Sequence, residues 1–491
     1  MNILLIHPFT RKGKQAIIPF GITYLAAVLK NCDHTVKILD FNLKQISTEK
    51  EIKKEIQELE FDIVGIGGIV TAYAQLNIIV KIVKQKDKGV PVMVGGTLGS
   101  SIPELLFKNE NIDLVALGEG EHIIDPVVRN LISGNYKELT RIPGIVFRNN
   151  GAVVYTEKPT RINSIDELPF PAYDLLDMEK YIKNSAGSTK YVPTDKKKGK
   201  DVRGFTIITG RGCPYRCTFC YNTFGNKCVK HSVDNTIRHI RFLKDEYGIN
   251  LFDITDELFI LKKSWILEFT RRLIEEDIQI WYRFWGRADI MDEDIYRYLK
   301  DSGCVFISYG FESGSDRMLK RMKKGIKVEK YFQAMTLSQK YGITTCPTYV
   351  IGMPGENRRS LLETALLIYK TAYFKIPCGL FFATAYPGSE LYRHALEKKH
   401  ITDEHKYLNS ISNKDAIKLT INFTHLPSFE LSVWITAMGW LHELGYAIHR
   451  GQFVLFFKTL IKIFFGSIIK SFIKITRLPM NRKSVLKEGL R

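Results

Sequence analysis

The chain has 491 residues, which is long enough for two or three domains with hydrophobic cores of their own. Its apolar content of 45% and charged content of 25% are those of an ordinary folded protein and exclude a disordered composition. The formal net charge of +19 favours an anionic partner, such as a membrane surface or a phosphorylated molecule, although a solvated lysine-rich surface explains part of the excess. The basic residues are scattered and no recognition module is visible, so we expect no nucleic-acid partner.

The cysteines do not indicate a disulfide scaffold. Eight are present, which is few for this length, and they show no paired framework. Reduced thiols indicate a reducing compartment, so we expect a cytoplasmic protein. The first residues lack a basic region and a long apolar core, and they predict a buried strand in place of a signal peptide.

Residues 1–145 alternate short apolar runs with helix-like segments. Fully apolar strands separated by helices predict an α/β domain whose parallel sheet is covered on both faces, in a doubly wound, Rossmann-like arrangement. The expected strands lie at residues 3–6, 36–39, 63–68, 90–96 and 114–121, and helical segments are expected at 24–29, 49–59 and 74–84.

Several glycines follow the expected strands of this domain. In an open α/β sheet the ligand crevice lies outside the carboxyl ends of the strands, where glycine lets a ligand approach the backbone. No G-x-G-x-x-G fingerprint opens the first helix, so a dinucleotide is not favoured. The candidate cofactor-binding residues at these strand ends are Gly67, Gly68, Gly95, Gly96, Thr97, Gly118 and Glu119.

Residues 146–200 are expected to form a proline-containing connector, after which the βα alternation resumes over residues 201–390. Six βα units predict a partial (β/α)6 barrel with its functional residues at the C-terminal ends of the strands. The expected strands lie at 205–209, 251–255, 280–285, 305–310, 345–351 and 380–385, with helices at 234–247, 263–277, 292–301, 328–341 and 360–373.

Three cysteines, Cys213, Cys217 and Cys220, follow the first of these strands with the spacing C-x3-C-x2-C. Each iron of a cubane cluster takes one external ligand, so three thiolates leave one iron open to a bound molecule. A zinc site is one alternative, since Cys228 or His231 could supply the fourth ligand that zinc requires. The other alternative is that the three thiols are unrelated and share no ligand.

This cysteine turn, in its setting after the first barrel strand, resembles the radical S-adenosylmethionine (SAM) superfamily. Residues 1–145 resemble the cobalamin-binding domain that precedes many radical SAM domains, in P-F-G-I-T-Y-L-A-A at 19–27, G-G-T at 95–97 and G-E-G-E at 118–121. The D-x-H-x-x-G motif, which donates a histidine to cobalt in other cobalamin proteins, is absent, so a degenerate domain without cobalamin is the alternative. The resemblance covers residues 1–390 and implies a [4Fe–4S] cluster, SAM and cobalamin as cofactors.

The resemblance also implies roles for residues near the strand ends. Phe219 would pack near the adenine of SAM or shield the cluster from water. Asp256 or Glu257 would accept hydrogen bonds from the SAM amino group, unless the two acids only stabilise a helix N-terminus. Glu312 and Ser313 would bind the ribose hydroxyls or the methionine carboxylate. Further candidates are Met353 and Pro354 beside the adenine, and Arg283 or Arg287 at the SAM carboxylate, with ordinary ion pairs as the alternative for the arginines.

The last part of the chain, residues 391–491, predicts a mainly α-helical region with a long apolar helix at 427–450. Within 453–476, lysines recur at intervals of four and eight residues among phenylalanine and isoleucine, which fits an amphipathic helix lying in a membrane surface. A membrane-spanning helix would bring these lysines into the hydrocarbon at about 2.5–3.5 kcal/mol each. A helix docked on the protein's own core is the alternative.

The resemblance implies that a reduced cluster cleaves SAM and forms a 5′-deoxyadenosyl radical, which takes hydrogen from an unactivated substrate carbon. Methyl transfer from cobalamin would follow, so we expect a C-methyltransferase with a flavodoxin- or ferredoxin-like electron donor. The basic helix favours a lipid or isoprenoid substrate and a place at the inner face of the membrane. The alternatives are a non-methylating cyclase or ligase and a non-catalytic cobalamin or Fe–S sensor. A methylthiotransferase is not favoured, because its N-terminal domain should carry three cluster cysteines and only Cys32 is present there.

Overall fold

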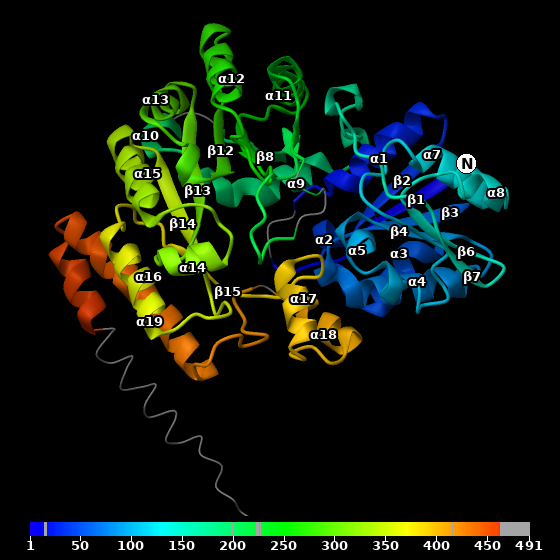
Figure 1. Cartoon of the computed structure of the whole chain (residues 1–491). Helices are drawn as coiled ribbons and strands as arrows, with labels where there is room; N and C mark the ends of the chain where they lie inside the picture. Colours follow the sequence, from blue (N-terminus) through cyan, green and yellow to red (C-terminus); the bar gives the residue numbers. More distant parts are fainter. Residues whose placement is uncertain (14–16, 198–200, 222–224, 226, 415, 462–491) are drawn as a thin grey trace, which may run out of the picture.

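Two α/β units lie side by side in the computed structural model of the chain, which describes residues 1–13, 17–197, 201–221, 225, 227–414 and 416–461. Figure 1 shows the N-terminal unit in blue to cyan and the central unit in green to yellow. The connector contributes α9 (Met178–Asn184), which lies between the two units, and α10 (Thr194–Lys197).

The N-terminal unit is a sheet of seven strands, counted over the described residues, in the order β2-β1-β3-β4-β5-β6-β7. Its first five strands pair in parallel and consist largely of buried apolar residues. The strands are β1 (Asn2–His7), β2 (Thr35–Asp40), β3 (Ile63–Gly67), β4 (Val92–Gly95), β5 (Leu114–Ala116), β6 (Ile145–Asn149) and β7 (Ala152–Tyr155). The helices are α1 (Phe20–Asn31), α2 (Phe41–Lys44), α3 (Glu49–Gln57), α4 (Tyr73–Lys86), α5 (Gly96–Ser101), α6 (Pro103–Leu106), α7 (Ile124–Ile132) and α8 (Tyr136–Leu139).

Helices cover both faces of this sheet. Apolar residues of α1 and α7 pack with Ile3 and Leu5 on one face, whereas those of α3 and α4 pack with Leu4 and Ile6 on the other. Because side chains alternate between the faces of a strand, a strand covered on both faces, such as β1 at residues 3–6, is apolar at successive positions. The predicted doubly wound arrangement is therefore confirmed.

The sheet continues beyond the predicted parallel strands. β6 pairs antiparallel with β5, and β7 pairs antiparallel with β6. The sequence predicts a connector from residue 146, but residues 145–155 form this hairpin at the edge of the sheet. Most side chains of β7 are exposed, so the strand lacks the apolar run that reveals a buried strand.

The central unit is an open half-barrel of six parallel strands within the described part of the chain, in the order β15-β14-β13-β12-β11-β8. Each predicted barrel strand overlaps an observed one, so the partial barrel is confirmed. The strands are β8 (Gly204–Ile207), β11 (Leu251–Ile254), β12 (Trp281–Gly286), β13 (Cys304–Glu312), β14 (Thr344–Ile351) and β15 (Gly379–Phe382). The helices are α11 (Val233–Tyr247), α12 (Lys263–Glu275), α13 (Glu293–Asp301), α14 (Asp316–Arg321), α15 (Val328–Tyr341) and α16 (Arg358–Lys370).

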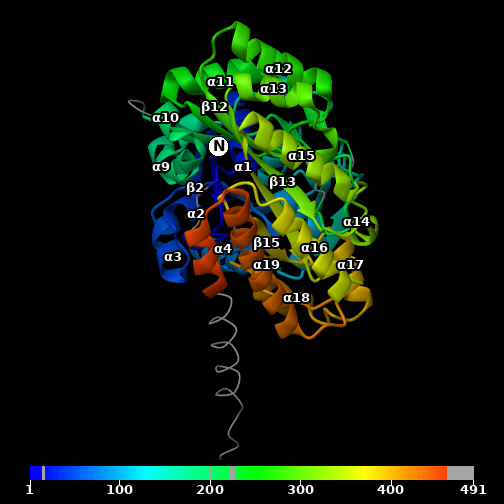
Figure 2. The same ribbon diagram turned by 90° about the vertical axis from the view of Figure 1, so that its left-hand side faces the viewer.

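The helices after the barrel pack against both units. α17 (Glu390–Glu397) and α18 (Glu404–Ile411) share a hydrophobic core with α4 of the N-terminal unit. α19 (Ser428–His449) lies beside α16, as Figure 2 shows, and Arg358 pairs with Glu430 across this contact at 2.8 Å. Residues 453–461 are helical, whereas the rest of the predicted amphipathic helix lies outside the described residues. No helix in the described residues is long and apolar enough to cross a bilayer.

Candidate functional site

The three motif cysteines lie on a loop that leaves the C-terminal end of β8. The short strands β9 (Gly210–Arg211) and β10 (Val229–Lys230) pair antiparallel on either side of this loop and close its base. Gly212 has a φ of +85°, and a Cβ there would lie 2.3 Å from the carbonyl oxygen of Lys227. The N–H of Gly212 donates to the carboxylate of Glu257. Only glycine fits this turn, which determines where the cysteine loop begins.

The thiols of this loop face a cavity of about 710 Å³. A hydrogen bond from Cys220 lowers the pKa of Cys217 to about 7 against the opposing effect of burial, and the nearby charge of Lys324 adds to the lowering. Burial raises the pKa of Cys213. The residues lining the cavity are Cys213, Tyr215, Arg216, Cys217, Cys220, Tyr221, Glu257, Lys323, Gly388, Glu390 and Arg393.

The donor atoms can be compared with what a zinc site and a cubane cluster each require. Among the residues that the structure describes, no three His, Cys, Asp or Glu side chains converge so that they could hold one metal ion. In a cubane each thiolate binds a different iron, so three thiols need not converge on one point. Nδ1 of His231, the alternative zinc ligand, lies 2.7 Å from Oδ1 of Asp166. Burial raises the pKa of Cys228 to about 11, which favours the protonated thiol.

The predicted glycines lie along the carboxyl edge of the N-terminal sheet, where the strand order reverses between β1 and β3. Gly96 has a φ of +73°, and a Cβ there would lie 3.0 Å from the carbonyl oxygen of Gly68. The hydroxyl of Thr97 donates to the same oxygen at 3.3 Å. Gly67 instead allows close helix packing, because a Cβ there would lie 2.5 Å from Ile22 of α1. The edge therefore exposes bare backbone around Gly68 and Gly96, which fits a broad cofactor such as cobalamin.

Tyr221, the residue after the last motif cysteine, joins this glycine edge to the cysteine loop. Its hydroxyl donates at 3.4 Å to the carbonyl oxygen of Thr97, which follows the last residue of β4, Gly95, by two positions. The backbone of Gly388, with a φ of +89°, passes so close that a Cβ there would lie 2.2 Å from the Tyr221 ring. Since Tyr221 and Gly388 both line the cavity, the space over the thiols adjoins the glycine edge.

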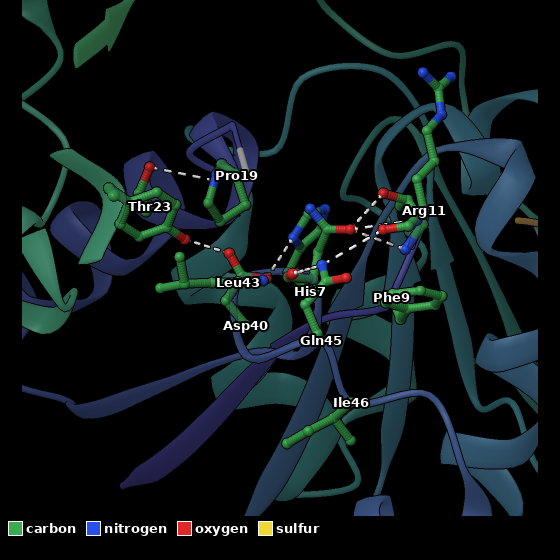
Figure 3. A network of polar contacts seen from close by, with 12 residues as sticks. His7, Phe9, Arg11, Pro19, Thr23, Asp40, Leu43, Gln45 and Ile46 are labelled. Atoms are coloured by element: carbon green, nitrogen blue, oxygen red, sulfur yellow. Dashed lines mark hydrogen bonds and ion pairs between the residues drawn. The ribbon is translucent and has the colours of Figure 1, made fainter. Parts of the chain in front are cut away.

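A polar network at the ends of β1 and β2 was not predicted from the sequence, and Figure 3 shows it from close by. Nδ1 of His7 lies 3.0 Å from Oδ1 of Asp40, and the hydroxyl of Tyr181 in α9 donates to the same carboxylate. Burial opposes ionisation of Asp40, but His7 and the hydrogen bonds outweigh it and lower the pKa of this carboxyl. His7 and Asp40 each follow directly after buried or half-buried apolar residues at the end of a strand, and that position is the signal that could have revealed them.

Comparisons with known proteins agree with this geometry. The family model of the radical SAM superfamily matches residues 207–368, and that of the B12 binding domain matches residues 6–128. An uncharacterized methyltransferase of Pyrococcus horikoshii is 31% identical over 408 residues, which cover 81% of this chain and 83% of that protein. The chain belongs to the radical SAM superfamily. Its two family domains imply a [4Fe–4S] cluster, SAM and cobalamin as cofactors.

Other proteins are similar to this chain over most of their length. The anaerobic magnesium-protoporphyrin IX monomethyl ester cyclase of Rubrivivax gelatinosus is 26% identical over 422 residues, which cover 83% of this chain and 72% of that protein. Among solved structures, the radical SAM methyltransferase TsrM from Kitasatospora setae, with cobalamin and a [4Fe–4S] cluster bound, has a TM-score of 0.64 at 18% identity. That match covers 81% of this chain and 75% of TsrM, and it shows a shared fold.

Basic groups surround the cysteine loop of this radical SAM protein. Nζ of Lys324 donates to Oε1 of Glu312 at 2.8 Å, and both residues are buried. Burial disfavours the charge on Lys324, but Glu312 and then Cys217 outweigh it and raise the pKa of the lysine. The guanidinium of Arg287 lies 3.5 Å from the ring centre of Tyr215 in the loop. A cluster on these thiols would therefore lie near two positive charges, which stabilise its reduced, more negative state.

The two acidic residues after β11 have different surroundings. The buried carboxylate of Asp256 accepts hydrogen bonds from the N–H and the hydroxyl of Thr209, both at 2.6 Å, and pairs with Lys230 at 2.9 Å. These donors hold the end of β8 against the end of β11. Glu257 instead lines the cavity with the cysteines, and desolvation by the surrounding protein raises the pKa of its carboxyl.

Other predicted SAM contacts are not among the residues that line the cavity. The buried hydroxyl of Ser313 lies 3.2 Å from that of Thr364. Arg283 pairs with a carboxylate of β11, and Phe219 packs against the hydrophobic core that contains Met353 and part of the N-terminal unit. The SAM contacts predicted for these residues therefore stay predictions.

Glu119, predicted at the cofactor edge, is buried and directed toward the central unit. Its Oε2 accepts a hydrogen bond from the N–H of Ile162 at 2.9 Å, and its Oε1 lies 3.4 Å from Nη1 of Arg211. Gly118, with a φ of +73°, packs against Pro159, where a Cβ would lie 3.2 Å from the proline ring. The segment after β5 therefore holds the connector, whereas the ends of β3 and β4 form the open edge.

Proposed function

We propose that this radical SAM enzyme methylates an unactivated carbon atom. The observation that carries the proposal is the hydrogen bond from Tyr221 to Thr97, because it brings the cavity over the thiols against the glycine edge of the B12-binding domain. A substrate held in the cavity would then lie within reach of both cofactors. The names of the Pyrococcus horikoshii relative and of TsrM, both methyltransferases, support the same function.

The residues of the cavity suggest how the reaction is prepared. When bound, the cluster and SAM supply a 5′-deoxyadenosyl radical, and cobalamin supplies a transferable methyl group. The three motif thiolates would hold three irons and leave the fourth to SAM. Of the two carboxylates on the cavity wall, Glu390 pairs with Lys323, whereas Glu257 lies at the start of the cysteine loop and would accept charge-assisted hydrogen bonds from the SAM amino group. Glu312, which is buried against Lys324 and is not among the residues that line the cavity, stays the sequence-based candidate for the ribose hydroxyls.

Anaerobic reconstitution of the full chain with iron, sulfide and hydroxocobalamin tests the proposal. Bound iron and cobalt are measured, and 5′-deoxyadenosine and S-adenosylhomocysteine are assayed after SAM and dithionite are added, dithionite replacing the proposed flavodoxin- or ferredoxin-like donor. We expect about four irons and one cobalt per chain, and both products. Deoxyadenosine without S-adenosylhomocysteine would instead favour a non-methylating reaction, such as the ring formation that the name of the Rubrivivax gelatinosus relative indicates.

Two cysteine variants separate the cluster from the zinc alternative. Cys217→Ala removes one motif thiolate and should lose most of the bound iron together with deoxyadenosine formation. Cys228→Ala removes a thiol that only a zinc site would need, and should keep about four irons. Unchanged iron in Cys217→Ala, or a zinc ion that is lost in Cys228→Ala, would refute the assignment of the cluster.

We further propose a lipid or isoprenoid substrate that is taken from a membrane surface. The support is the helix at 453–461, where exposed apolar side chains lie next to a lysine, as in helices that lie in a bilayer surface. These side chains are Phe453, Val454, Phe457 and Ile461, which are 74%, 69%, 60% and 56% exposed, and the lysine is Lys458. Sedimentation with vesicles of phosphatidylglycerol tests the contact, with a chain truncated after residue 450 as the control. No sedimentation of the full chain, or equal sedimentation of both, would rule it out.

A further inference from the structure

A buried ionic network joins the B12-binding domain to the base of the cysteine loop. Its central residue is Arg211 in β9, which lies two positions before Cys213 and is only 8% exposed. Nη2 of Arg211 lies 2.7 Å from Oε1 of Glu121, and Nη1 lies 3.4 Å from Oε1 of Glu119. The guanidinium also lies 4.8 Å from the ring centre of Tyr24 in α1. One arginine beside the cysteines thus contacts three side chains of the other domain.

Both carboxylates come from the G-E-G-E segment at 118–121, which the sequence predicts at the cofactor edge. Glu119 accepts a hydrogen bond from Ile162 with its second oxygen, so the connector is attached to the same network. Gly120, between the two acids, leaves little space, because a Cβ there would lie 3.1 Å from Leu25 of α1. The segment therefore directs its acidic side chains toward the cysteine loop.

The energetics of this buried network favour a role in orienting the cysteine loop over a role in stabilising the fold. The guanidinium and both of its carboxylate partners are buried, with Arg211, Glu119 and Glu121 8%, 6% and 7% exposed. A buried ionic network commonly adds little stability over apolar residues of the same volume, whereas removal of one member leaves an unpaired charge. The planar guanidinium, however, meets carboxylates in a defined geometry and so restricts the direction of the arginine.

We propose that Arg211, held between Glu119 and Glu121, is a positioning residue that orients the cysteine loop relative to the cobalamin edge. Gly212 follows it directly and donates its N–H to Glu257, so a shift of Arg211 moves both the first thiol and the carboxylate on the cavity wall. The residue acts through this loop and not on the reacting atoms. This inference rests on the cofactors of the proposed function.

The test compares Arg211→Met, Arg211→Lys and Glu121→Gln with the wild type in the reconstituted full chain. The readouts are iron and cobalt content, the EPR spectrum of the reduced cluster with and without SAM, the dissociation constant of SAM and the Tm. Arg211→Met should keep its iron and cobalt, change the SAM-dependent EPR signal and weaken SAM binding about tenfold, as outer-shell variants of metal sites do. Glu121→Gln keeps the shape and removes one charge, so its effect should be smaller, and Arg211→Lys should restore part of the loss.

Arg203→Met is the matched control. Arg203 lies immediately before β8, at the end of that strand opposite the cysteine loop, and pairs with Glu179 of α9. Its variant should keep the wild-type EPR signal and SAM affinity. The proposal is overturned if Glu121→Gln, with an unchanged Tm, has the wild-type EPR signal and SAM affinity, or if Arg203→Met alters them as strongly as Arg211→Met. Failure of the proposed function would look different, because it would appear in the wild type itself, as missing iron or cobalt or as deoxyadenosine formed without S-adenosylhomocysteine.

Discussion

The ion pair between Lys230 and Asp256 allows a quantitative test of how the base of the cysteine loop is held. Nζ of Lys230 lies 2.9 Å from Oδ2 of Asp256 and 2.7 Å from the hydroxyl of Thr209. The two ionic side chains are 8% and 1% exposed, and the ammonium lies 4.6 Å and 4.0 Å from the ring centres of Phe259 and Trp265. Burial lowers the pKa of Lys230 although Asp256 opposes this shift, so the buried charge depends strongly on its partner.

Lys230→Met keeps the apolar part of the side chain near the rings but removes the ammonium. The Asp256 carboxylate then retains the two donors of Thr209 and loses its counter-charge, and the loss of one partner of a buried pair costs about 3–5 kcal/mol. Asp256→Asn should cost a similar amount, because it leaves the lysine unpaired. The double variant contains no unpaired charge and should cost no more than either single variant, so we expect a coupling energy of about 3 kcal/mol.

Urea unfolding followed by tryptophan fluorescence measures these free energies, and Trp265 reports directly on the region because it contacts Lys230. In thermal denaturation, a loss of 3–5 kcal/mol corresponds to a fall in Tm of about 6–20 °C for each single variant, at roughly 2–4 °C per kcal/mol. Single effects that add to within about 0.5 kcal/mol in the double variant would refute the reasoning, because the two charges would then act independently.

Three further predictions concern the surrounding residues. Burial raises the pKa of Glu356 from 4.5 to about 7, so the stability that depends on its protonated carboxyl is fully present below pH 4.5 and is lost as the pH rises to 7. Glu356→Gln should therefore gain up to about 3 kcal/mol relative to the wild type over that range, and parallel curves of Tm against pH for the two proteins would contradict this. Gly388→Ala should lower the Tm more than Gly134→Ala, because both glycines have a positive φ but only a Cβ at 388 would meet the Tyr221 ring, at 2.2 Å. Equal falls in Tm for the two variants would be inconsistent with this contact. Lys324→Met removes a buried positive charge beside the thiols and should make the reduction potential of the cluster more negative, and an EPR redox titration with an unchanged potential would argue against the electrostatic effect.

Buried parallel strands are the elements that the sequence predicts best. Residues 3–6 and 63–66 are almost wholly apolar because helices cover both faces of the sheet, and such runs are visible without knowledge of strand pairing. The β6–β7 hairpin lacks this signal because the side chains of β7 are mostly exposed. The packing of α17 and α18 into the core of the N-terminal unit was also missed, since a helical pattern shows an apolar face but not the element that covers it.

The candidate site is predictable only where its contacts are local in the sequence. The three cysteines lie on one short loop, and their spacing together with their place after the first barrel strand indicates a shared ligand. Glu119 and Arg211 are 92 positions apart, and no local pattern shows that they meet. Asp256 and Glu257 are adjacent, and a strand-end motif predicts the same role for both, whereas the fold encloses one and leaves the other on the cavity wall.

The contacts between the two units bear on how a substrate reaches the cavity. Domains within a chain move relative to each other by default unless their interface is extensive. Here Arg211 joins the base of the cysteine loop to the B12-binding domain by an ion pair, and Tyr221 joins the end of the loop to the glycine edge by a hydrogen bond. In addition, α17 and α18 pack into the hydrophobic core of the same domain. Separation of the domains would break all of these contacts at once. A substrate is therefore expected to reach the cavity without separation of the two domains, so the distance between the two cofactor sites stays constant.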